Sequence, residues 1–250
     1  MTMTSSPPDS SAEVIGVGLT RTARITGLLY LGLAVTGALG YQLVRGQLYV
    51  ADDPAGTLSN LVEHTATARL GIVLELGIVL TQALAAVWFY RLFRSVDSFA
   101  AGLVAVFGMV NAVAILGSAA VLATALDVAD DRSLAVSGGA AATVQLLYVI
   151  SGHLWGVGGL FFGLWLIPMG WLVVRSRWLP RPLGQLLMVG GAGYVLSTFV
   201  SYVFADADLV AGLLTVPATI GELWIIGYLI LFGVRDHARP DRENAPVTAT

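Results

Sequence analysis

The chain has 250 residues, of which 56% are hydrophobic and 12% are charged, and its formal net charge is −3. Its mean hydropathy is +0.80. Soluble domains are about 45–50% apolar and about 25% charged, so this composition indicates a membrane protein. The absence of cysteine excludes disulfides, thiolate nucleophiles and cysteine-based metal sites, and no basic block indicates nucleic-acid binding.

The two ends of the chain predict disordered tails. Residues 1–20 are rich in Ser, Thr and Pro and have no apolar periodicity, and residues 237–250 are also polar. A secretory signal peptide is disfavoured, because the apolar stretch from Ile25 continues to about Val44 and no clear cleavage site follows.

The region between the tails, residues 21–236, contains six apolar stretches, each near or above the ~20 residues that cross a bilayer. We therefore predict an all-α, polytopic transmembrane helix bundle with six spans. These spans cover about 25–44, 69–90, 99–126, 143–174, 184–204 and 209–234. The first loop is the longest, and its second half, from Thr57 to Leu70, favours a short interfacial helix.

The arginines predict the orientation. Three arginines fall on one side of the predicted bundle, namely Arg45, Arg69 and Arg132. The other ten fall on the opposite side, namely Arg21, Arg24, Arg91, Arg94, Arg175, Arg177, Arg181, Arg235, Arg239 and Arg242. Because basic residues are enriched on the cytoplasmic side, both termini are predicted to be cytoplasmic. We expect a multi-pass protein of the bacterial cytoplasmic membrane.

Glu222 interrupts the apolar run "ATIGELWIIGYLI" (218–230) near the midplane of the sixth span. A charge at this depth costs about 2.5–3.5 kcal/mol on insertion scales. The residue therefore has three possible states: it is protonated, it pairs with a partner, or it lines a wet cavity. A protonated glutamate bonded to a neighbouring helix is a structural reading, and a proton site or ligand anchor is a functional one.

Other polar side chains fall inside the predicted spans. Glu75 and Gln82 lie two turns apart on one face of the second span, and Asn111 lies midway along the third. His153, Tyr202 and Arg69 are at a similar depth to Glu75, in the outer leaflet. If these residues converge, they form an outward-opening pocket with Glu222 deeper. The alternatives are a histidine hydrogen-bonded at the interface and an arginine that extends to the headgroups.

Glycines are frequent inside the spans, in particular at 152, 156, 159 and 163 in the fourth and at 190, 191 and 193 in the fifth. Small residues let membrane helices approach closely. This spacing is typical of close packing within one bundle, and a homo-oligomer through the glycine-rich helices is the alternative.

No pattern in the sequence predicts a cofactor or a metal. There is no H-E-x-x-H, no histidine pair four residues apart and no P-loop. Haem between two helices is disfavoured, because His64 lies in or beside a loop while His153 lies in a span.

The segment from Gly158 to Val195, "GGLFFGLWLIPMGWLVVRSRWLPRPLGQLLMVGGAGYV", resembles the signature region of a bacterial membrane family, domain of unknown function 4386. Its "FFGLWL" segment, its basic–Ser turn and its Pro before "LG-x-LL" match that region. The opening "RITGLLYL" and the sixth span, with Glu222, are also similar. The resemblance covers roughly residues 21–235. It implies a membrane protein of six to seven helices and supplies no catalytic residues.

Three functions remain open. The leading hypothesis is an integral membrane protein that binds or moves a small molecule or protons through an outward-facing polar pocket. The second is a membrane-embedded enzyme that acts on a lipid or apolar substrate, for which Glu75, His153 and Tyr202 are the candidate reactive groups. The third is a structural or regulatory partner without chemistry. The bilayer is the expected partner in each case, with a small molecule or lipid as a possible ligand.

Overall fold

The computed structural model describes residues 10–137, 139–204 and 206–234, and these residues form helices joined by short turns. The long helices are α1 (Ser10–Gly37), α4 (Thr65–Phe93), α5 (Ser98–Asp130), α6 (Gly139–Ser176), α7 (Arg181–Val203) and α8 (Asp208–Leu231). Short elements complete the chain, namely the π-helical η1 (Ala38–Val44), α2 (Arg45–Leu48), α3 (Pro54–Glu63) and the 3₁₀ turn η2 (Arg132–Leu134).

Among the described residues, six helical segments are long and apolar enough to cross a membrane, which confirms the predicted all-α fold with six spans. They run over Gly18–Leu48, Thr65–Phe93, Ser98–Asp130, Gly139–Ser176, Arg181–Val203 and Asp208–Leu231. Every span also exposes large apolar side chains, for example Leu28, Val113 and Leu223. Such a surface is expected where the solvent is lipid rather than water.

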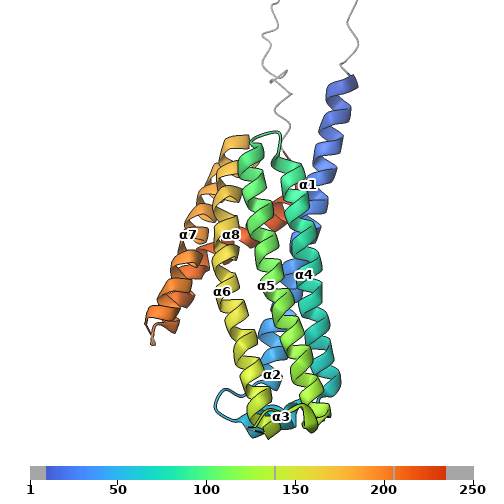
Figure 1. Ribbon diagram of the computed structural model, residues 1–250. Helices are drawn as coiled ribbons and strands as arrows, with labels where there is room; N and C mark the ends of the chain where they lie inside the picture. Colours follow the sequence, from blue (N-terminus) through green and yellow to red (C-terminus); the bar gives the residue numbers. More distant parts are fainter. Residues whose placement is uncertain (1–9, 138, 205, 235–250) are drawn as a thin grey trace, which may run out of the picture.

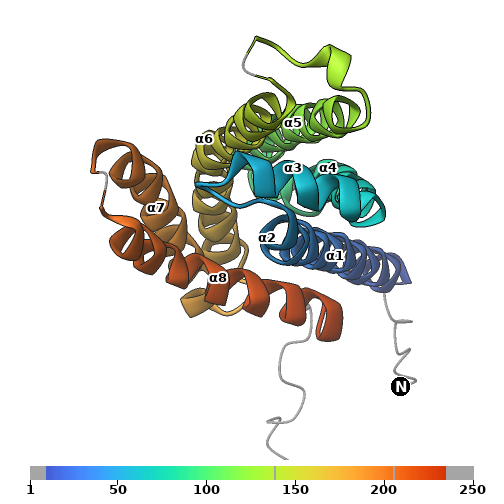
Figure 2. The same ribbon diagram turned by 90° about the horizontal axis from the view of Figure 1, so that it is seen from below.

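The long helices form a ring in chain order. Each of α1, α4, α5, α6 and α7 packs against the next, and α8 returns to pack against α1 (Figures 1 and 2). Gly233 lies against Thr20, so the first half of α1 and the end of the described chain lie at the same end of the bundle.

The first span differs from its expected limits of 25–44. α1 begins at Ser10, inside the segment 1–20 that was expected to be disordered, and the helical path continues through η1 and α2 to Leu48. Continuation to Leu48 places Arg45 within the helix instead of in the following loop. Residues 1–9 and 235–250 of the predicted tails lie outside the described residues.

Local sequence signals account for several helix starts. Asp97 caps α5 by accepting a hydrogen bond from Ala100 N at 3.0 Å. Asp53 caps α3 in the same way through Gly56 N at 2.9 Å, and Pro54 follows it at the first helical position. The helix expected over Thr57–Leu70 is present only in part: α3 ends at Glu63, and the residues from Thr65 onward belong to α4.

The ring has two apolar cores. The larger core is built around Tyr30, Phe89 and Trp165, all almost fully buried. The second surrounds Leu61 of α3 and Val144 of α6. It lies at the end of the bundle that α3 covers, past the end of the α7–α8 hairpin (Figure 1). α3 therefore caps the bundle at the end opposite the described termini.

Glycines bring α6, α7 and α8 into close contact. A Cβ at Gly163 would lie 2.8 Å from Val195 N, and one at Gly190 would lie 2.5 Å from Cα and N of Ala218. Both neighbours are backbone atoms, so these positions require glycine for close packing. Close packing within one bundle thus accounts for these two glycines, whereas a homo-oligomer stays a prediction.

Candidate functional site

A cavity of about 760 Å³ opens among α1, η1, α6, α7 and α8, with α4 and α5 behind it. Small-molecule sites have volumes of roughly 300–1,000 Å³. Five of the predicted site residues line this cavity, namely Glu222, His153, Tyr202, Gln82 and Asn111. The sequence separations among them reach 140 residues, so only the ring packing brings them together.

Glu222 lies at the deep end of the cavity and is half-buried. Its Oε1 accepts a hydrogen bond from the hydroxyl of Tyr30 on α1. Tyr30 is fixed by edge-to-face contacts, with its ring centroid 5.5 Å from that of Phe89 and 5.3 Å from that of Trp165. The larger core thus orients the donor, while the carboxylate itself stays at the cavity wall.

A buried amide pair lies on the α4–α5 side of the cavity. Asn111 Nδ2 donates to Gln82 Oε1 at 2.9 Å. The Nε2 of Gln82 is buried and has no hydrogen-bond partner among the described residues. A buried amide with an unused donor costs free energy, and a bound molecule or water in the cavity would satisfy it.

His153 and Tyr202 form the mouth of the cavity. His153 Nδ1 and Tyr202 Oη are 3.2 Å apart, and both side chains are exposed. A Cβ at Gly156 would lie 3.0 Å from Tyr202 Oη, so the small residue at 156 leaves room for the tyrosine. A shallower hollow of about 450 Å³ adjoins this mouth and shares His153 and Tyr41 with the cavity.

Glu75 does not line the cavity. It is buried on α4, and its Oε1 accepts hydrogen bonds from Trp155 Nε1 at 3.0 Å and Ser118 Oγ at 3.2 Å. Trp155 lines the cavity, so its indole separates Glu75 from it. Oε2 of Glu75 is buried without a partner among the described residues.

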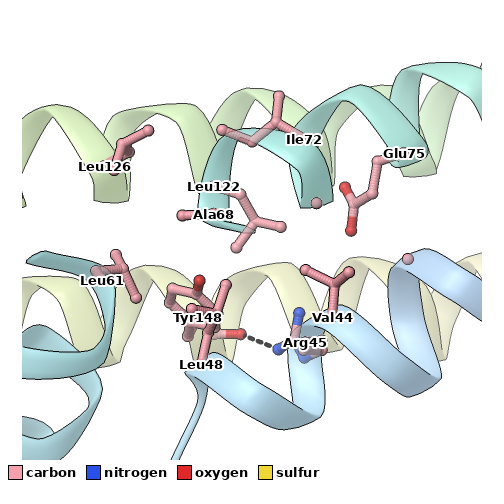
Figure 3. A pocket seen from close by; sticks show the side chains of 12 residues that line it. Val44, Arg45, Leu48, Leu61, Ala68, Ile72, Glu75, Leu122, Leu126 and Tyr148 are labelled. Atoms are coloured by element: carbon pink, nitrogen blue, oxygen red, sulfur yellow. Dashed lines mark hydrogen bonds between the residues drawn. The ribbon is translucent and has the colours of Figure 1, made fainter. Parts of the chain in front are cut away.

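Glu75 instead lines a small second pocket together with Arg45 and Tyr148 (Figure 3). The carboxylate and the guanidinium face each other there across the pocket, whose volume of about 20 Å³ is enough for roughly one water molecule. Two opposite charges therefore face each other across this pocket, inside the bundle and outside the large cavity.

Arg45 is a functional candidate that the sequence did not reveal. Its guanidinium donates to Ser151 Oγ at 2.7 Å and to the Tyr148 carbonyl at 2.5 Å, both on α6. It also lies 5.5 Å from the ring centroids of Tyr41 and Tyr49. Sequence reasoning counted Arg45 only as an outer-side charge, because its partners on α6 are more than 100 residues away.

Arg69 lies apart from both pockets. It is exposed on α4, one turn after the start of the helix.

Over the described ranges, the structure holds no group of three His, Asp or Glu side chains that could bind a metal ion. Tyr30, the donor to Glu222, was also missed, because a tyrosine among apolar residues carries no signal of a distant partner.

A family model described as "Domain of unknown function (DUF4386)" matches residues 25–233. The match covers most of the chain, which therefore belongs to this family. No curated protein and no solved structure matches the chain.

Proposed function

We propose that this integral membrane protein of the DUF4386 family binds a small molecule in the large cavity, with Glu222 as the polar anchor, as part of moving it across the membrane. The observation that carries the proposal is the cavity itself, of about 760 Å³, with a glutamate carboxylate at its deep end. An acid at this depth costs several kcal/mol unless it is paired or solvated, and proteins tend to keep such a residue for function.

The mouth of the cavity lies beside the loop end of the α7–α8 hairpin, where α7 ends at Val203, and this end of the hairpin points away from the described termini (Figure 1). With the arginine-rich termini in the cytoplasm of a bacterium, the cavity faces outward. This arrangement supports uptake or release at the outer face of the cytoplasmic membrane.

An enzyme acting on a lipid is less well supported. It would need Glu75, His153 and Tyr202 in one reactive cluster. His153 and Tyr202 are adjacent, but Trp155 stands between the cavity and Glu75. The described lining residues hold no other group of acids and bases near the mouth.

Thiol labelling tests whether the cavity is open to water. The natural chain has no cysteine, so single substitutions give clean signals. Thr219 lines the cavity on α8, whereas Val189 on α7 is 61% exposed and does not line it. The two are at a similar depth, because their neighbours Ala218 and Gly190 are in contact.

We expect Thr219→Cys to react with a charged, membrane-impermeant methanethiosulfonate reagent added outside intact cells, and Val189→Cys to stay unreactive in lipid. Equal, negligible labelling of both variants would contradict a water-accessible cavity. Labelling of Thr219→Cys only from the cytoplasmic side would contradict the proposed orientation.

A further inference from the structure

The charges around the cavity are unbalanced. Glu222 is the one carboxylate among the described lining residues, and none of these residues is Arg or Lys. Arg45 lies near the mouth, but it donates to Ser151 and Tyr148 and faces Glu75. Glu222 therefore has the Tyr30 hydroxyl as a neutral donor. The one basic side chain in the described lining is His153, which lies at the mouth beside Tyr202.

The walls of the cavity are rich in aromatic rings. Six aromatic side chains line it, namely Tyr30, Tyr41, Trp155, Phe162, Tyr194 and Tyr202. The face of an aromatic ring attracts a cation, and this attraction increases when the cation is desolvated. Arg45 already uses Tyr41 in this way, and the ring of Tyr30 is almost fully buried in the larger core, which leaves four rings for a ligand.

Trp155 is the most favourable of these rings. Indole is the strongest cation–π partner among the aromatic side chains. Its N–H donates to the buried carboxylate of Glu75 at 3.0 Å. A carboxylate bonded at the ring edge adds negative potential to the indole, so Glu75 strengthens the attraction although it does not line the cavity.

Other ligand classes fit this lining less well. An anion would face the Glu222 carboxylate without a countercharge. A neutral apolar molecule would displace water from that carboxylate and leave it with a single hydroxyl donor, and an unpaired buried charge costs several kcal/mol. A cation supplies the missing charge and uses the rings as well.

We infer that the cavity binds a lipophilic organic cation, whose positive centre lies between the Glu222 carboxylate and the ring of Trp155 or Tyr194 and whose apolar groups occupy the rest of the cavity. This inference rests on the proposed small-molecule function and specifies its ligand class. It joins three observations, namely the lone carboxylate, the aromatic walls and the volume.

Tetraphenylphosphonium and tetraphenylborate test the inference, because the two ions have the same four phenyl groups and opposite charges. Binding of each to the purified full-length protein in detergent is measured by equilibrium dialysis, with protein-free micelles subtracted to remove partitioning. We expect saturable binding of the phosphonium near one ion per chain and no saturable binding of the borate.

Three variants complete the design. Glu222→Gln is expected to weaken phosphonium binding at least tenfold. Glu63→Gln, the same chemical change at an exposed position on α3, is expected to leave it unchanged. Thr215→Lys introduces a competing cation on the cavity wall, and it should weaken binding at least tenfold even if Glu222→Gln proves unstable.

Equal binding of both ions would overturn the inference while leaving a small-molecule cavity in place. Unchanged phosphonium affinity in Glu222→Gln or in Thr215→Lys would also overturn it. Absence of saturable phosphonium binding, together with external labelling of Thr219→Cys, would reject the cationic ligand but not the open cavity.

Discussion

Gly190 is a position at which one added methyl group should disturb the cavity wall. It lies where α7 crosses α8, and a Cβ there would lie 2.5 Å from Cα and N of Ala218. Ordinary contacts of a Cβ are 3.4–4 Å. Because the opposing atoms are backbone, no change of rotamer relieves the clash, and the two helices must separate by about 1 Å.

The expected cost of Gly190→Ala follows from two opposing terms. Overpacking typically costs about 1–3 kcal/mol, whereas replacing a helical glycine by alanine returns up to about 1 kcal/mol. With the full gain, the difference is a loss of about 0–2 kcal/mol. Because the clash is with backbone atoms, we expect the upper half of this range, about 1–2 kcal/mol. For a chain of this size that loss corresponds to a fall in Tm of roughly 2–8 °C.

Gly227→Ala is the matched control, since a Cβ at Gly227 of α8 would meet nothing within 4 Å. Its Tm should stay equal to that of the wild type or rise slightly. The assay is thermal unfolding of each purified variant in one detergent, followed by circular dichroism at 222 nm. A Gly190→Ala protein as stable as Gly227→Ala would refute the close packing of α7 on α8.

Two further predictions concern the charges. Arg45→Leu removes two hydrogen bonds to α6 and the positive charge that faces Glu75. It should cost about 3 kcal/mol, because a hydrogen bond to a charged group contributes about 1.5–3 kcal/mol, and Glu75→Gln should restore part of this loss in the double variant. Additive effects in denaturation experiments, within about 0.5 kcal/mol, would show that the two groups do not interact. In intact cells, an impermeant maleimide should label Ser133→Cys between α5 and α6, whereas Ser95→Cys between α4 and α5 should require permeabilisation. The reverse pattern would place the termini outside.

The number and type of the spans were predictable from the sequence, because a run of about 20 apolar residues has few alternatives in a bilayer. Boundaries were less predictable. The first span contains Arg45 only because α6 supplies an acceptor carbonyl and a serine hydroxyl for its guanidinium. Those partners belong to tertiary structure, and the local sequence around Arg45 carries no trace of them.

The candidate site was predictable to a similar degree. A polar residue in an apolar span costs free energy of insertion, so it is a candidate for a functional role. This reasoning selected Glu222, Gln82 and Asn111, which line one cavity. It could not place Glu75 behind Trp155. The depth of a residue along its span does not show which neighbouring helix the side chain faces. Whether the selected residues act in function stays a prediction.

The unequal lengths of the helices have a consequence for the surrounding lipid. At 1.5 Å per residue, α7 with 23 residues is about 35 Å long, whereas α6 with 38 residues is about 57 Å long. The hydrocarbon core of a bilayer is about 30 Å thick, so the α7–α8 hairpin matches it with little excess, while α6 can slide or tilt.

Hydrophobic mismatch therefore acts mainly on one wall of the cavity. Each ångström of additional bilayer thickness costs a fraction of a kcal/mol, and the short hairpin bears that cost while the longer helices do not. The length of the lipid acyl chains should therefore affect how far the α7–α8 hairpin lies from the rest of the ring at the mouth of the cavity. The affinity for the proposed ligand should then depend both on the chain and on the thickness of the membrane around it.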